Sequence, residues 1–166
     1  MGTRCGDIDP AVVTYIMGKE GYSPDEMSNF MNKKSGLLGV SGISSDSRDI
    51  EAAVKEGNYR ATLAANILGY GIKKYVGSYI AAMNGVDAIV FTAGMGENNA
   101  EMRERVCKDM EFFGIELDTE ANAKTYKPQG PMEISKPGSK VKVYVIPTNE
   151  ELMIARETDR IVSARK

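Results

Sequence analysis

Two segments of the chain share one pattern: a short apolar run that ends in turn residues and leads into an amphipathic helix. The first run covers residues 87–92, and a glycine-containing turn connects it to a helical pattern over residues 99–113. The second run covers residues 141–146, and a turn at residues 147–150 leads into a helix that ends near Val162. Continuous β-prone runs of this length are typical of strands that are buried on both faces. Two such units joined by a crossover predict an α/β fold with a few parallel strands packed with helices.

The first half of the chain is predicted to be helical. One helix begins at Asp9-Pro10 and ends near Gly21. A second begins at residues 23–26, where Ser23, Pro24 and Glu26 form a capping box with proline at the first helical position. The stretch at residues 35–42 contains three glycines and ends this helix, and a short helix follows from about residue 46 to residue 57.

A long amphipathic helix is predicted over residues 58–84, because its larger apolar residues recur at intervals of three and four. These residues are Leu63, Ile67, Ile72, Val76, Tyr79, Ile80 and Met83. Small residues on the same segment predict close packing against another element. These are Ala64, Ala65, Gly69, Gly71 and Gly77.

The size and composition of the chain predict one compact domain over residues 1–166. Charged residues make up 27% of the chain and hydrophobic residues 42%, which is the composition of an ordinary globular protein. A sheet of two strands is small for such a domain. Either the glycine-rich stretches supply further strands, or the chain belongs to something larger.

The charge balance and the amino acids that are absent exclude several classes of function. The net charge is -2 with acidic and basic residues mixed along the chain, so we expect no nucleic-acid partner. No apolar run approaches the roughly 20 residues that span a bilayer, and we expect no membrane segment and no secretory signal. Cys5 and Cys107 are far apart, which fits a reduced cytoplasmic protein. With no histidine, histidine bases, phosphohistidine intermediates and most zinc sites are excluded.

The glycine-containing turn at residues 94–98 is a candidate nucleotide site. It follows a strand and precedes a helix, where glycines admit a ligand close to the backbone and the helix offers free amides. A tight strand-to-helix turn without a ligand explains the same residues equally well. A dinucleotide-binding fingerprint is not supported, because the third glycine is missing.

Three further polar segments have both a functional and a purely structural interpretation. Arg4 can clamp a phosphate or carboxylate, or it can pair with Asp7 or Asp9 as a loop staple, and sequence alone favours the staple. Residues 46–49 can be a helix start with intrahelical ion pairs. Residues 149–151 can be a capped first turn with acidic residues favoured by the helix dipole.

Five blocks of the sequence together resemble successive blocks of the acetate kinase family, in that family's order and at about its spacing. The blocks are MGTRCGDIDP at residues 1–10, KKSGLLGVSG at 33–42, SSDSRD at 44–49, VFTAGMGEN at 90–98 and VIPTNEELMIARET at 145–158. The resemblance covers essentially the whole chain, and propionate and butyrate kinases share parts of it. It implies the C-terminal part of an actin-like, ribonuclease H-like ATPase domain, as in actin, sugar kinases and Hsp70 ATPases. The implied activity is transfer of the ATP γ-phosphoryl group to acetate, which gives acetyl phosphate and ADP, and the reverse reaction.

The resemblance also implies roles for individual residues. Arg4 matches the arginine that stabilises the transferring phosphoryl group, and Glu150 matches the residue assigned to Mg²⁺ or Mn²⁺, with Glu151 as the alternative. Ala93 stands where many members have a further glycine, a change we expect to be tolerated. The residues implied to bind the nucleotide are Asp46, Ser47, Arg48, Gly94, Met95, Gly96, Glu97 and Asn98.

Members of the family are much longer than this chain, so the resemblance implies that the N-terminal half of the active site lies outside it. We therefore expect the isolated chain to have little or no turnover and to aggregate or be partly disordered. Its expected partners are the missing N-terminal half, a second copy in a homodimer, ATP or ADP, and acetate or acetyl phosphate. Two alternatives remain: a propionate or butyrate kinase fragment, and a non-catalytic nucleotide-binding module.

Overall fold

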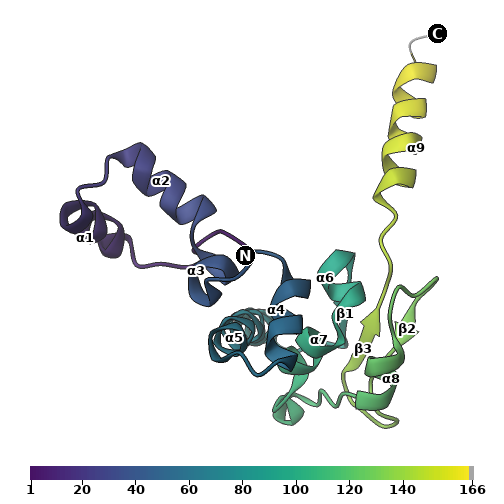
Figure 1. Cartoon of the computed structure of the whole chain (residues 1–166). Helices are drawn as coiled ribbons and strands as arrows, with labels where there is room; N and C mark the ends of the chain where they lie inside the picture. Colours follow the sequence, from purple (N-terminus) through teal and green to yellow (C-terminus); the bar gives the residue numbers. More distant parts are fainter. Residues whose placement is uncertain (165–166) are drawn as a thin grey trace. The chain divides into compact units, whose positions relative to one another are not determined.

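The structure is a computed structural model that describes residues 1–164 (Figure 1). The chain divides into two compact units, Met1–Asn84 and a second that begins at Gly85. The expectation that they form a single domain stays a prediction. No helix among the described residues is both long and apolar enough to cross a membrane.

The first unit is entirely helical. Its helices are α1 (Pro10–Glu20), α2 (Pro24–Lys33), α3 (Gly36–Ser41), α4 (Ser47–Lys55) and α5 (Tyr59–Ala82). The predicted start of α2 is confirmed, because the Ser23 hydroxyl accepts a hydrogen bond from the Glu26 amide and the Glu26 carboxylate accepts one from the Ser23 amide. The predicted end of α1 at Gly21 is also confirmed. The stretch at residues 35–42 was expected only to interrupt the helical pattern, but it contains the short helix α3.

The core of the first unit forms where α3 and α4 pack against α5. Its buried residues are Leu37, Ile50, Ala61, Ala64 and Ala65. The close packing predicted for the small residues is confirmed for Ala64, Ala65 and Gly69. Of the larger apolar residues of α5, Ile80 is buried at 8% exposure, but Leu63, Ile67, Tyr79 and Met83 are 40 to 61% exposed and do not form the buried face. Small side chains let the helix axes approach, and this turns the larger residues toward the surface.

The second unit combines a three-stranded sheet with helices. Its elements are β1 (Ala88–Phe91), α6 (Ala93–Asn98), α7 (Ala100–Cys107), the 3₁₀ helix η1 (Glu111–Phe113), α8 (Thr119–Lys124), β2 (Met132–Glu133), β3 (Lys142–Val145) and α9 (Glu150–Ser163). The strand order is β1-β3-β2 (Figure 1). β1 and β3 run parallel, with Ala88 opposite Lys142, as the sequence predicts. β2 is antiparallel to β3, so the sheet is mixed, and its third strand comes from the proline-containing connection.

Two expectations for the second unit were wrong. β1 is not buried on both faces, because Phe91 is buried while Val90 is 48% exposed. It is also an edge strand of the sheet. The helix expected over residues 99–113 ends at Cys107, because Asp109 has a left-handed backbone with φ of 56°. The buried hydrophobic residues of the second unit come from several elements and connecting segments rather than from one strand or one helix face. They include Met102, Val106, Met110, Ile115, Ile134, Val141, Val143 and Val145.

Candidate functional site

The two segments that follow the parallel strands meet at one edge of the sheet. Because β1 and β3 are parallel, their carboxyl ends lie at the same edge. The Glu97 carboxylate after β1 accepts hydrogen bonds from the amide and the hydroxyl of Thr148 after β3, at 2.9 and 3.1 Å. This bond joins residues 51 positions apart. It fixes the candidate nucleotide segment beside the turn that precedes Glu150.

The candidate nucleotide segment is the short helix α6 rather than the open turn that the sequence predicts. Gly96 is buried against β1, and a Cβ there would lie 3.1 Å from the carbonyl carbon of Phe91. A Cβ on Gly94 would meet no atom within 4 Å, so its surface is open. Ala93 has a φ of 58°, a conformation in which glycine avoids a strain of about 1 kcal/mol. This strain is the physical reason for glycine at that position in the implied family pattern.

Asn98 has a buried acceptor without a partner. Its side-chain oxygen Oδ1 makes no hydrogen bond within the described part of the chain. A buried acceptor left in this state costs about 1–3 kcal/mol, and such groups often mark a site where a water molecule or ligand binds. Asn98 and the open side of Gly94 therefore provide a polar atom and free space on the same short helix.

Backbone hydrogen bonds of the neighbouring residues fix the position of Arg4. Among the described residues, its side chain does not form the ion pair with Asp7 or Asp9 that sequence alone favours. The Cys5 amide donates to the Met31 carbonyl at 2.8 Å, and the Ser35 amide donates to the Thr3 carbonyl at 2.9 Å. Asp7 accepts from the Tyr75 hydroxyl at 2.5 Å, and Asp9 caps α1. Within residues 1–164 neither aspartate forms a salt bridge with Arg4.

The Arg4 side chain faces a polar cavity of about 650 Å³ in the first unit. The cavity is lined by Thr3, Arg4, Asp25, Ser28, Asn29, Asn32 and Lys33. The cations Arg4 and Lys33 and the side-chain amides of Asn29 and Asn32 can attract and hydrogen-bond an anion. The Asp25 carboxylate would repel it. Sequence reasoning missed the α2 residues of this cavity, although their spacing places them on one face of the helix.

Asp46 and Arg48 bond to each other, as the structural interpretation of residues 46–49 predicts. Asp46 caps α4 by accepting from the Arg48 amide at 2.8 Å, and the guanidinium of Arg48 lies 2.5 Å from the Asp46 carboxylate. Arg48 is 88% exposed at its side chain. A role of Asp46, Ser47 and Arg48 in nucleotide binding stays a prediction.

The Asp46 contacts give a testable pH dependence. Bonding to Arg48 lowers the pKa of Asp46 from 3.8 to about 2. The Asp46 carboxylate binds a proton less readily in the folded state than in the unfolded state. Its contribution to the free energy of unfolding is therefore complete above about pH 4 and is lost as the pH falls toward 2. An NMR titration is expected to show the Asp46 carboxyl titrating near pH 2, and Asp46→Asn should remove this part of the acid sensitivity while it keeps the cap. Titration of Asp46 at 3.8 or above would contradict the ion pair.

Glu150 occupies the first position of α9, and Asn149 caps this helix by accepting from the Leu152 amide at 3.0 Å. Glu150 and Glu151 are both exposed. The described residues contain no group of three or more carboxylate, cysteine or histidine side chains that could hold a metal. One or two exposed carboxylates fit a Mg²⁺ ion that takes its other ligands from phosphates and water. The assignment of Glu150 stays a prediction.

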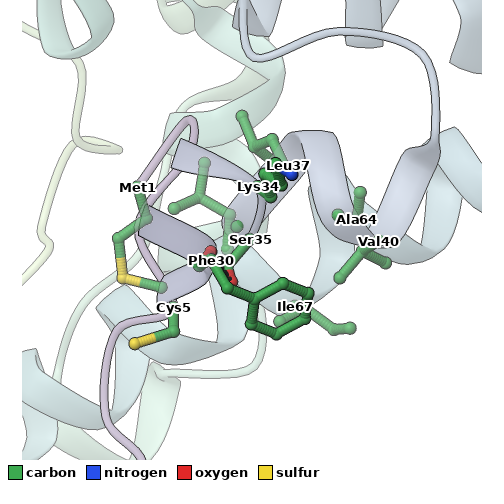
Figure 2. Close-up of a pocket in the computed structure, with 12 residues that line it drawn as sticks. Met1, Cys5, Phe30, Lys34, Ser35, Leu37, Val40, Ala64 and Ile67 are labelled. Carbon is green, nitrogen blue, oxygen red and sulfur yellow. Dashed lines mark hydrogen bonds between the residues drawn. The ribbon is translucent and has the colours of Figure 1, made fainter. Parts of the chain in front are cut away.

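A separate apolar pocket lies in the first unit between the residues that begin the chain, α3 and α5 (Figure 2). Its volume is about 430 Å³, and Figure 2 shows Phe30, Val40 and Ile67 among the residues around it. Lys34 is the one charged residue of its lining. None of the lining residues is a predicted site residue, so this pocket is not part of the candidate site.

Comparison with known proteins agrees with the resemblance of the five blocks. A model of the acetokinase family matches residues 1–156. The acetate kinase of Halothermothrix orenii is 57% identical over 164 residues, which are 99% of this chain and 40% of that protein. The acetate kinase of Clostridium botulinum strain Alaska E43 is 59% identical over 162 residues, which are 98% of this chain and 40% of that protein.

Solved structures give the same result. The crystal structure of Porphyromonas gingivalis acetate kinase matches with a TM-score of 0.90 at 56% identity, over 98% of this chain and 40% of that one. A propionate kinase from Francisella tularensis matches with a TM-score of 0.85 at 39% identity, over 95% of this chain and 39% of that one. The chain thus spans about 40% of the length of these relatives. The predicted α/β fold, part of an actin-like ATPase domain, is confirmed, and the chain belongs to the acetokinase family.

Proposed function

We propose that this chain is the C-terminal nucleotide-binding part of an acetate kinase, which reversibly transfers the γ-phosphoryl group of ATP to acetate. The observation that carries the proposal is the 56 to 59% identity to acetate kinases over almost the whole chain. Because the chain spans about 40% of those proteins, the complete reaction requires the part that they have in addition.

Arg4 is the residue of this chain that acts on the reacting phosphoryl group. The transition state of phosphoryl transfer spreads negative charge over three oxygens, and a fixed guanidinium can bond two of them. Support comes from its lack of an ion pair within residues 1–164 and from the polar cavity around it. The backbone bonds of residues 3 and 5 fix the position from which it reaches the substrate.

The edge of the sheet in the second unit supplies nucleotide contacts. The open surface of Gly94 is available to ADP or ATP, and the buried, unpaired oxygen of Asn98 lies on the same short helix. Glu150 would hold Mg²⁺, directly or through water, and the bound ion would neutralise charge on the phosphates. The hydrogen bond between Glu97 and Thr148 keeps the nucleotide contacts on α6 close to the turn that precedes Glu150.

The missing N-terminal part of the kinase is the principal partner. Apolar side chains of α9 are exposed to solvent, including Met153 with an exposed fraction of 58% and Ile154 with 66%. Contact with another part of the kinase would remove them from water. The exposed strand β1 is a sheet edge that requires the same protection. We expect the assembled enzyme to be a cytoplasmic homodimer.

A propionate kinase is the second candidate, supported by the match to the Francisella tularensis protein. The relatives reported above at 56 to 59% identity are acetate kinases, which favours acetate. A non-catalytic nucleotide-binding module would need neither a free Arg4 nor an acidic start of α9.

An ATP-dependent hydroxamate assay for acetyl phosphate tests the proposal. The samples are this chain alone, the part of the Porphyromonas gingivalis acetate kinase that this chain does not cover, their mixture, and a fusion of the two in one chain. Neither part alone is expected to turn over, and the fusion is expected to be active with acetate. Robust activity of the isolated chain would contradict the proposal. A folded but inert fusion would instead support the non-catalytic module.

A further inference from the structure

Arg103 on α7 is a buried cation that donates four hydrogen bonds to neutral acceptors. Its side chain is fully buried, with 0% of the residue exposed. Its guanidinium donates to the Asn122 side chain at 2.7 Å, to the Gly96 carbonyl at 2.8 Å, and to the carbonyls of Asn122 and Thr125 at 3.0 and 2.7 Å. Burying a charge is costly unless its hydrogen bonds are satisfied. The hydrogen bonds of Arg103 offset this cost and connect three helices, α6, α7 and α8.

The acceptors of Arg103 form a rigid support behind α6. Asn122 is 1% exposed, and its amide group donates to the Ala100 carbonyl at 2.9 Å. Thr125 is 5% exposed. On its other side Gly96 packs closely against Phe91 of β1, where a Cβ would lie 3.1 Å from the Phe91 carbonyl carbon. The backbone of α6 is therefore held between the strand on one side and the Arg103 guanidinium on the other.

We propose that Arg103 is the positioning residue of the nucleotide segment: through the Gly96 carbonyl it fixes α6 so that the open side of Gly94 faces the nucleotide and Asn98 is held on the same short helix. Arg103 does not itself touch the ligand. This inference rests on the proposed nucleotide binding and deepens it. The residue carries no signal in the sequence, because an arginine in a helix with Glu101, Glu104 and Arg105 reads as a solvated position.

Arg103→Gln tests the inference in the complete chain, and Arg105→Gln is the matched control because it removes the same charge from the same helix. Amide hydrogen exchange is measured at Asn99, which donates to the Met95 carbonyl of α6, and at Ile134, which donates to the Val143 carbonyl of the sheet. Arg103→Gln is expected to speed exchange at Asn99 at least tenfold and leave Ile134 unchanged. Mg-ADP affinity measured by calorimetry is expected to fall at least tenfold. Arg105→Gln should change neither quantity.

Equal loss of protection at Asn99 and Ile134 would show a general role in folding and would overturn the inference, as would unchanged exchange at Asn99. If Arg103→Gln does not fold, Arg103→Lys decides, because a lysine keeps the charge but its compact ammonium group cannot reproduce the four bonds that the guanidinium makes to Gly96, Asn122 and Thr125. It is expected to speed exchange at Asn99 severalfold, and no change there would overturn the inference. If the unsubstituted chain does not bind Mg-ADP, nucleotide binding by this chain fails, but the exchange comparison still decides the role of Arg103.

Discussion

Replacing Arg4 by glutamine is expected to lower the kcat of the fused enzyme described above about 10³-fold or more, with little change in the KM for ATP. An arginine that stabilises the transferring phosphoryl group contributes roughly 10³ to 10⁵ to the rate. Arg4 is suited to this role because Asp7 is engaged by Tyr75 and Asp9 by the cap of α1, which leaves the guanidinium available. Initial rates of acetyl phosphate formation over a range of ATP concentrations measure both parameters.

Arg4→Lys is the matched control for this prediction. It keeps the charge but cannot form the planar two-point contact, so we expect it to remain at least about tenfold below the unsubstituted fusion. A kcat for Arg4→Gln within tenfold of the unsubstituted value would remove Arg4 from the chemistry and favour a role in local structure.

Gly36→Ala is expected to destabilise the first unit by at least about 2 kcal/mol. Gly36 has a φ of 62°, and a Cβ there would lie 2.3 Å from the Met1 carbonyl oxygen and 2.8 Å from that of Arg4. Left-handed backbone alone costs a residue with a side chain about 1–2 kcal/mol, and the clash with backbone atoms adds to it. The substitution also pushes away the segment that carries Arg4, so the fusion should lose activity.

Urea denaturation measures the change in free energy of unfolding, and Gly18→Ala provides the control. Gly18 lies within α1, and a Cβ there would meet no atom within 4 Å. Alanine in a helix is more favourable than glycine by about 1 kcal/mol, so this variant should be slightly more stable. Faster amide exchange at Leu37 and Leu38, which donate to the Met1 and Gly2 carbonyls, should accompany the loss in Gly36→Ala. A Gly36→Ala variant as stable as Gly18→Ala would contradict the close approach.

Local signals in the sequence predict the end of α1 at Gly21 and the start of α2, because the groups involved lie within a few residues of one another. The capping box of Ser23 and Glu26 is an example. The parallel pairing of β1 and β3 follows instead from two strand-turn-helix units joined by a crossover. The buried face of α5 is not predictable in this way, since it depends on which side α3 and α4 approach. The short strand β2 is not predictable either, because two residues carry no periodic pattern.

The same limit applies to the candidate site. The sequence could not decide between a free and a stapled Arg4, because the answer depends on Tyr75, which bonds Asp7 from 68 residues away. It predicts that residues 94–98 and Glu150 follow two parallel strands, but the bond between Glu97 and Thr148 becomes visible only in the folded chain. Arg103 bonds Gly96 of α6 and also Asn122 and Thr125 of α8 and its C-terminal cap, and the sequence does not indicate the position of α8.

The measurement that tests the central claim most directly is a thermal unfolding experiment on the purified chain with increasing Mg-ADP. A ligand at one hundred times its dissociation constant stabilises the folded state by about 2.7 kcal/mol, so the account predicts a rise in Tm of several degrees that grows with the logarithm of the Mg-ADP concentration. Such a rise would mean that the contacts at Gly94 and Asn98 are assembled in this chain. A cooperative transition whose Tm does not change with Mg-ADP would contradict the account, and nucleotide affinity would then depend on the part of the kinase outside this chain.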